Sequence, residues 1–219
     1  RFKSTEVDGY TSLAKYVERM LADQKAIYYL SGGTEAALRN SPLLEAYRKR
    51  KLEVLIMDDD SDELIAPVIG RYKDHELKAI NRSDANEDIS SEVDEHTRKQ
   101  AEPAVDRIRT ALGDRVKDVR LSTRLTDSPS AVVVDEGDPS WALQQMMKAL
   151  GQGEDSPTKP ILEINPAHAV ILRIAGDPTD EAVADLSRIL LDQALLVEGV
   201  ALPDPADFVQ RLNRVISAG

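Results

Sequence analysis

The chain has no cysteine, few aromatic residues and no long apolar run. Without cysteine it can form neither a disulfide nor a thiolate metal site, which suits a reducing compartment. Its apolar runs are far shorter than the roughly 18 residues needed to span a bilayer, and no signal peptide is visible. We therefore expect a cytoplasmic protein without a membrane segment.

Basic charge is also scarce, since the 219 residues carry 28 Lys and Arg against 39 Asp and Glu, a net charge of −11. Electrostatic repulsion argues against nucleic acid or an anionic membrane as the main partner. The three histidines, His75, His96 and His168, stand singly in dissimilar contexts. No catalytic or metal-binding spacing emerges from them, so we expect no cofactor or metal in this chain.

The most conspicuous feature present is a pair of C-terminal helices, 181–197 and 204–216. In the first, Glu181, Asp185, Arg188 and Asp192 form one narrow charged strip, and the remaining surface is mostly apolar. In the second, Asp204 is a suitable N-cap and Pro205 suits the first turn.

Two interpretations of this pair stay open. The helices could be a terminal hairpin packed on its own domain, or they could associate with a second copy to complete a four-helix bundle. The candidate interface residues are Leu186, Ile189, Leu190, Leu195, Phe208, Leu212, Val215 and Ile216.

The first part of the chain predicts an α/β subdomain. A helix capped by Ser12 is followed by a strand at 26–30, then a helix that begins at Thr34 and restarts at Ser41-Pro42, and then a strand at 52–57. This order predicts a βαβ unit with a parallel strand pair. We expect a short helix at 62–66, ended by Pro67, and then irregular chain with one short strand at 71–80.

The remainder predicts an α+β domain. Helices are expected at 97–112, 141–150 and from Asn165-Pro166 to about 174, with strands at 116–121, 131–134 and 161–164. The first two strands are joined by a turn over 126–129. The acidic stretch 84–95 has the composition of a solvated linker or of the start of a linker helix, so we divide the chain into 1–83, a linker at 84–96, and 97–219.

Two further segments are candidates for binding. The turn Ser31-Gly32-Gly33-Thr34 lies where a phosphate could meet a helix, and a small α/β enzyme acting on a phosphorylated ligand is one alternative function. The turn lacks the Lys of a P-loop and the third glycine of a dinucleotide fingerprint. In the helix 141–150, Leu143, Met146, Met147 and Leu150 form one apolar stripe, which by itself is more typical of a core than of a binding surface.

Seven segments in collinear order resemble the bacterial ninety-kilodalton heat-shock chaperones of the high-temperature protein G type. They are Ile27-Tyr28-Tyr29, Ser41-Pro42, Glu53-Val54-Leu55 with Asp62-Glu63, the stretch 116–121, Arg124 to Pro129, Leu162 to Pro166, and Leu190 to Leu196. Lys51, Ser61 and Leu64 depart from the usual pattern, since bacterial members often carry an aromatic residue in place of Leu64.

The resemblance implies a fragment of an ATP-dependent chaperone of the stress response, comprising the end of the middle domain and the C-terminal dimerisation domain. ATP and Mg²⁺ would bind an N-terminal domain upstream of Arg1, so this chain would not be an enzyme. It would form a homodimer and bind non-native client proteins through Glu63, Leu64, Trp141, Met146, Met147 and Leu150. No co-chaperone that reads an acidic Met-Glu-Glu-Val-Asp tail should bind, and a purely structural dimeriser is the other alternative.

Overall fold

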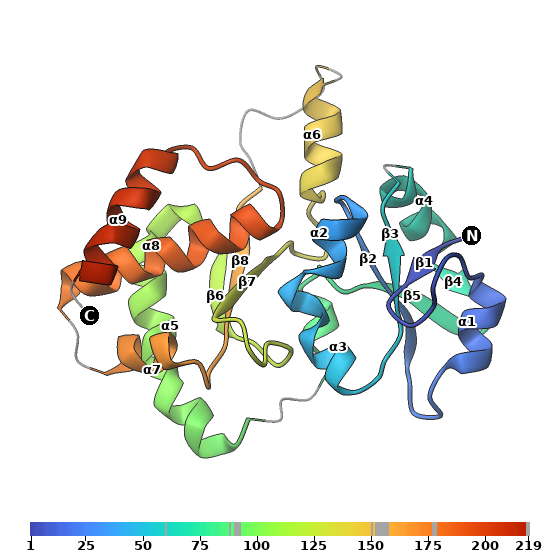
Figure 1. Ribbon diagram of the computed structural model, residues 1–219, viewed down its shortest axis with the longest axis horizontal. Helices are drawn as coiled ribbons and strands as arrows, with labels where there is room; N and C mark the ends of the chain where they lie inside the picture. Colours follow the sequence, from blue (N-terminus) through green and yellow to red (C-terminus); the bar gives the residue numbers. More distant parts are fainter. Residues whose placement is uncertain are drawn as a thin grey trace. The chain divides into compact units, whose positions relative to one another are not determined.

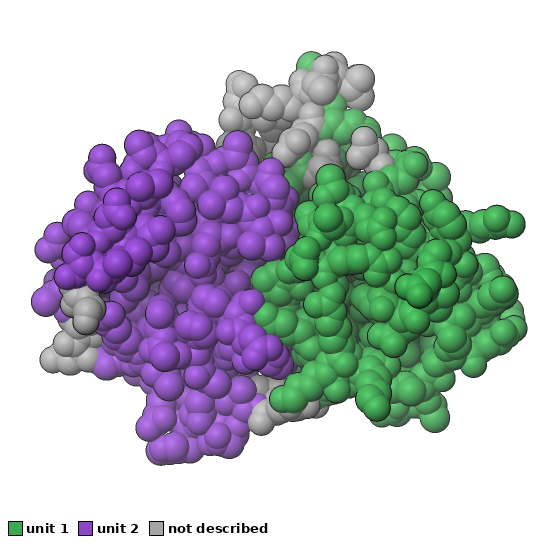
Figure 2. All heavy atoms as spheres, in the orientation of Figure 1, with its two compact units in different colours: residues 1–89, 134–158 green, residues 90–133, 159–219 purple. Residues whose placement is uncertain are grey.

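The chain forms two compact units. The computed structural model describes residues 1–59, 61–87, 89, 93–149, 151, 158–176 and 179–217. Unit 1 comprises residues 1–89 and 134–158, and unit 2 comprises 90–133 and 159–219 (Figure 2). Unit 1 therefore includes a segment from the second half of the sequence, which a division of the chain at 84–96 does not anticipate. That division stays a prediction.

Unit 1 is built on a five-stranded mixed sheet with the order β1-β3-β2-β5-β4 (Figure 1). The strands are β1 (Lys3–Ser4), β2 (Ala26–Ser31), β3 (Val54–Met57), β4 (Arg71–Tyr72) and β5 (His75–Ala79). β2 runs parallel to both β3 and β5, and β1 and β4 pair antiparallel with β3 and β5 respectively. The parallel pairing of β2 with β3 confirms the predicted βαβ unit.

Several helices of unit 1 begin at side chains that the sequence identifies as caps. The helices of this unit are α1 (Leu13–Arg19), α2 (Glu35–Arg39), α3 (Glu45–Lys49), α4 (Asp62–Ile69) and α6 (Trp141–Ala149), with the 3₁₀ turns η1 (Pro42–Leu44) and η2 (Asp84–Glu87). The side chains of Ser12, Thr34 and Ser41 each accept a backbone N–H at the start of α1, α2 and η1. These caps satisfy amide groups that have no partner within a helix.

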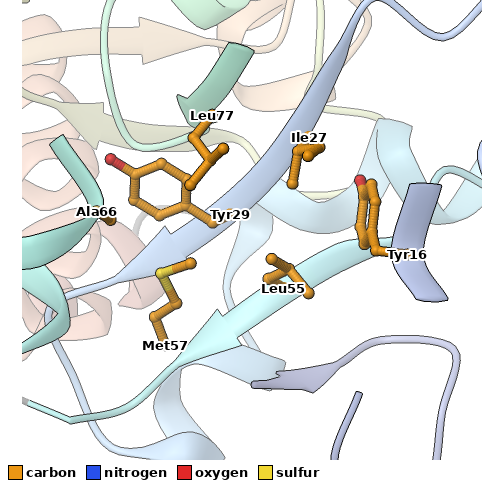
Figure 3. Close-up of a cluster of buried hydrophobic side chains, with 7 residues drawn as sticks. All are labelled: Tyr16, Ile27, Tyr29, Leu55, Met57, Ala66 and Leu77. Atoms are coloured by element: carbon orange, nitrogen blue, oxygen red, sulfur yellow. The ribbon is translucent and has the colours of Figure 1, made fainter. Parts of the chain in front are cut away.

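Helices cover both faces of the central strands, because alternate residues of a strand point to opposite sides. On one face, Ile27 and Tyr29 of β2 pack with Leu55 and Met57 of β3, and Tyr16 of α1, Ala66 of α4 and Leu77 of β5 complete the cluster (Figure 3). On the other face, the ring of Tyr28 lies edge-on to Tyr47 of α3, with 5.0 Å between centroids. The result is a three-layer α/β unit.

Three expectations for unit 1 were wrong. α4 continues through Pro67 to Ile69, because a proline in so short a helix removes a single hydrogen bond, and Gly70 with φ 59° ends it. Residues 71–79 form the regular hairpin β4–β5, whose turn has Lys73 at φ 54°. In the acidic stretch, Ala85 and Ile89 are fully buried and not solvated, although residues 88 and 90–92 of that stretch lie outside the described residues.

Unit 2 contains a three-stranded sheet with the order β6-β8-β7. The strands are β6 (Asp118–Leu121), β7 (Ser130–Val133) and β8 (Ile161–Ile164), and β8 runs parallel to β6 and antiparallel to β7. The predicted strands β6 and β7 are joined by the expected turn region but do not pair with each other. β8 lies between them and pairs with both.

The helices of unit 2 are α5 (Glu95–Leu112), α7 (Ala169–Ala175), α8 (Asp180–Val197) and α9 (Pro205–Ser217), with the 3₁₀ turn η3 (Gly113–Arg115). α5 and α8 pack on the sheet, α7 packs against α5, and α9 packs against α8 (Figure 1). α7 begins later than predicted, because the His168 side chain caps it at Val170 N. Two sheets with flanking helices confirm the predicted mixed α/β class.

A buried ionic cluster lies within the sheet of unit 2. The Glu163 carboxylate, on central strand β8, accepts hydrogen bonds from Arg124 Nε at 2.8 Å, Arg124 Nη2 at 2.6 Å, Arg120 Nη2 at 2.6 Å and Ser122 Oγ at 3.0 Å. The side chains of Glu163 and Arg124 are completely inaccessible to solvent. Burial opposes ionisation of Glu163, but the charges of Arg124 and Arg120 outweigh it and lower its pKa to about 2.

Candidate functional site

The charged strip of α8 faces α9, and this is the main feature that the sequence interpretation missed. Asp185 is only 5% exposed, and its carboxylate accepts hydrogen bonds from Arg211 Nη1 at 2.7 Å and Arg214 Nε at 2.8 Å. Arg211 also bonds Asp207 one turn earlier, at 2.7 Å. The hydrogen bond from Arg214 holds the pKa of Asp185 below its usual value. The two helices are therefore joined by ion pairs.

The same strip continues along α8. Asp192 is 2% exposed and accepts a hydrogen bond from Arg188 Nε at 3.0 Å, one turn away. Its other oxygen, Oδ1, is buried without a hydrogen-bond partner in the part of the chain that the structure describes. Burial raises the pKa of Asp192 even though the charge of Arg188 opposes that rise. The ion pairs between α8 and α9 could have been anticipated from the spacing of Arg211 and Arg214, which puts both guanidiniums on one side of α9.

The arginine side of α9 contacts α8, and its apolar side is covered only in part. Phe208, Leu212 and Val215 are half-buried, Val209 is 50% exposed and Ile216 is 68% exposed. None of the described side chains of α9 is buried. These five residues, here called the α9 stripe, recur at helical spacing on one side of the helix.

The predicted interface residues of α8 fall into two groups. Leu186 and Leu190 are 4% and 2% exposed, so their own unit already covers them and they belong to its core. Ile189 and Leu195 are half-buried. At the end of α8, Leu196 and Val197 are 46% and 42% exposed, and neither was among the predicted residues.

In unit 1, α4 has an exposed apolar side of its own. Leu64, Ile65, Val68 and Ile69 are 46%, 50%, 85% and 39% exposed, while Ala66 packs into the core. Of these exposed residues only Leu64 was predicted to bind a client. The neighbouring Glu63 accepts a hydrogen bond from Ser140 Oγ at 2.6 Å, immediately before α6.

The structure brings α4 and α6 together within unit 1. Trp141, Met146 and Met147 of α6 are half-buried, and Leu150 lies outside the described residues. The two predicted groups of client-binding residues, 63–64 and 141–150, are about eighty positions apart in the sequence, yet they come from neighbouring helices. We call the exposed residues of α4 together with Trp141, Met146 and Met147 the α4–α6 surface.

The turn Ser31 to Thr34 offers little to a phosphate. The Thr34 hydroxyl is engaged as the cap of α2, a helix of five residues. Glu35, which follows it, carries a negative charge at the same helix end and pairs with Lys3 at 2.7 Å. This carboxylate would repel a phosphate, so the local electrostatics do not favour the phospho-ligand alternative.

Two other kinds of site are absent from the described residues. No group of three or more potential ligands there is placed to hold a metal ion. Within the same residues, no helix is long and apolar enough to cross a membrane.

The chain matches the family model described as "Hsp90 protein" over residues 1–219. It is 48% identical to chaperone protein HtpG of Treponema denticola, 45% identical to that of Treponema pallidum and 43% identical to that of Wolinella succinogenes. These alignments cover 99%, 99% and 94% of the chain but only 35%, 35% and 34% of the relatives, so the chain spans about a third of their length. The chain belongs to the Hsp90 family of chaperones.

Proposed function

We propose that this chain supplies the self-association and part of the client-binding surface of an Hsp90-type chaperone. The observation that carries the proposal is the division of α9 into two sides. Its arginine side is joined to α8 by ion pairs to the buried Asp185, and its own unit covers the α9 stripe only in part, since Val209 and Ile216 are exposed. A partly exposed apolar stripe on an amphipathic helix is a candidate interaction surface.

The occupant we propose for the α9 stripe is the same stripe of a second copy, related by a two-fold axis. Four helices, α8 and α9 from each copy, would then form a bundle, whose packing uses apolar stripes of this kind. Ile189, Leu195, Leu196 and Val197 of α8 border the same surface in our proposal. A hollow of about 550 Å³ between the start of α8 and the end of α9, lined in part by Leu186 and Val215, could receive side chains of the partner.

For the α4–α6 surface we propose apolar segments of non-native proteins as the occupant. Val68 is 85% exposed, and its large apolar neighbours on α4 are between 39% and 50% exposed. They form one exposed apolar group on a single helix, which is typical of an interaction surface. The unbranched Met146 and Met147 adapt to differently shaped partners, as binding of many clients requires. The alternative function, that of a purely structural dimeriser, differs only in that the chain would not bind clients.

The client surface is tested by replacing its flexible residues. Changing Met146, Met147 and Leu150 together to Ser should lower affinity for reduced and carboxymethylated α-lactalbumin about 10-fold or more, since each buried apolar contact contributes about 1 kcal/mol. The melting temperature and the dimer mass should stay nearly unchanged. A large loss of stability would show instead that the stripe is core, and the client role would fail.

We place ATP binding and hydrolysis in another part of the chaperone. The chain contains no P-loop or dinucleotide fingerprint, and the resemblance puts the nucleotide pocket upstream of Arg1. We expect no thermal shift with ATP and Mg²⁺, and no phosphate release above background. Turnover that survives repurification would contradict this and would revive the small-enzyme alternative.

The remaining assignments follow from the family and the composition. We place the chain in the cytoplasm, in keeping with the absence of cysteine. We expect neither nucleic acid nor membrane as a partner because the net charge is −11.

A further inference from the structure

The chain that leads into α6 is fixed to the body of unit 1 before the helix begins. Ser83 N donates to Val134 O at 3.0 Å, and Ser83 Oγ donates to Asp135 Oδ1 at 3.0 Å. The Arg82 guanidinium donates to the backbone oxygens of Asp135, at 3.1 Å, and of Asp138. These bonds set the position of the point from which α6 starts, but they do not set its direction.

Ser140 supplies the contact that orients the start of α6. Its hydroxyl oxygen accepts the backbone N–H of Leu143 at 3.1 Å, which makes it the N-cap of the helix. The same hydroxyl donates its proton to Glu63 Oε2 of α4 at 2.6 Å. Ser140 is 4% exposed, so both bonds are shielded from water. One side chain therefore begins α6 and attaches it to α4.

The Glu63 carboxylate is directed inward, away from any client on the α4–α6 surface. Its Oε2 is taken by Ser140, and its Oε1 is buried with no hydrogen-bond partner among the residues that the structure describes. Its neighbours Leu64 and Ile65 are 46% and 50% exposed. The client-facing part of α4 is thus apolar, and the charged residue beside it contacts the chain itself.

We propose that Glu63 is a positioning residue, which holds α6 against α4 through Ser140 so that both helices present their apolar residues together. This inference rests on the proposed client-binding function. A hydrogen bond to a charged group shifts an equilibrium by roughly 10- to 100-fold. Without it the attached arrangement of α6 becomes a minor population, and the apparent client affinity falls in proportion to that population.

The chain offers a direct probe of this attachment, since its only tryptophan, Trp141, follows Ser140. Acrylamide quenching and fluorescence anisotropy of Trp141 report how α6 is held, with no client present. Glu63→Ala should raise the quenching constant and lower the anisotropy. Glu63→Gln keeps an oxygen that accepts the Ser140 proton and should stay near wild type. Glu76→Ala, at an exposed glutamate on β5 of the same unit, is the matched control and should change nothing.

A reciprocal exchange tests the pair itself. Ser140→Asp retains a good N-cap, but it cannot donate to Glu63 and sets two carboxylates against each other. Its Trp141 quenching should rise as in Glu63→Ala. Adding Glu63→Gln, whose amide can donate to the new aspartate, should restore quenching toward wild type. Failure of this restoration would overturn the assigned contact.

Client affinity is measured on the same variants with reduced and carboxymethylated α-lactalbumin. We expect Glu63→Ala to weaken binding about 10-fold and Glu63→Gln by less than about 3-fold. Weaker binding with unchanged Trp141 quenching would mean that Glu63 contacts the client directly, and the positioning role would be overturned. Raised Trp141 quenching with unchanged client affinity would support the contact of Glu63 with Ser140 but would overturn the proposed client surface.

Discussion

Replacing Glu163 by Ala should lower the free energy of unfolding of unit 2 by about 3–5 kcal/mol, because it leaves the charge of Arg124 buried without its counter-ion. Arg124 has no exposed surface, and two of its nitrogens donate to this one carboxylate. Urea unfolding followed by circular dichroism measures the loss. Trp141 fluorescence reports unit 1 in the same samples and should show no comparable change.

Two further variants distinguish the contribution of the buried Glu163–Arg124 pair from that of the partly exposed Arg120. Arg120 keeps 29% of its side chain exposed, so Arg120→Ala should cost no more than about 1 kcal/mol. Removing both buried charges together, as Glu163→Leu with Arg124→Met, should cost less than Glu163→Ala alone, since no buried ion is left unpaired. If all three variants lost equal stability, the loss would come from packing and the electrostatic explanation would fail.

The same cluster predicts how stability depends on pH. Glu163 has a pKa of about 2 in the folded chain against an ordinary value of 4.5. A lowered carboxyl pKa contributes stability that is fully present above the ordinary value and is lost as the pH falls toward the folded value. The advantage of wild type over Glu163→Gln should therefore be constant near neutral pH and shrink between about pH 5 and pH 2. An advantage unchanged at pH 2.5 would contradict the lowered pKa.

The second large effect concerns self-association. Leu212→Asp would place a carboxylate in the middle of the α9 stripe and should weaken the dimer by about 2–4 kcal/mol, or roughly 30- to 700-fold in dissociation constant. Ile216→Asp should act in the same direction. Because Ile216 is 68% exposed within a single copy, this change should leave the fold of each copy intact. Sedimentation velocity over a range of concentrations measures the effect.

Leu172 provides a matched control for both variants. It is a leucine of α7, in the same unit, 36% exposed and outside the α9 stripe. Leu172→Asp should leave the sedimentation profile as it is. If all three aspartate variants sedimented like wild type, the interface between copies would have to lie elsewhere.

The sequence predicted those parts of the fold that depend on neighbouring residues. Ser12, Thr34 and Asp204 cap helices as expected, and the strand at 161–164 has the predicted bounds. A cap or an alternating pattern is a local property, since it involves residues within one or two turns. The resemblance to the chaperone family rests on seven such local segments in order, and the family match confirms it.

Pairings between distant residues could not be predicted in this way. Nothing in Ile161-Leu162-Glu163-Ile164 shows that the strand lies between β6 and β7, or that its glutamate is buried against Arg124. The charged strip that contains Asp185 is a local pattern, but the partners of Asp185 on α9 are 26 and 29 positions away. The hydrogen bond between Glu63 and Ser140, which joins α4 to the start of α6, likewise links residues 77 positions apart. In each case the choice of partner is made by the folded arrangement.

The molar mass of the unmodified chain in solution tests the central proposal most directly. One chain has a mass of 24.1 kDa. Two copies joined through their α9 stripes should give twice that mass in sedimentation equilibrium at micromolar concentration, and Ile216→Asp should return the value toward that of one chain. A measured mass of 24.1 kDa at every concentration would contradict the proposed dimer.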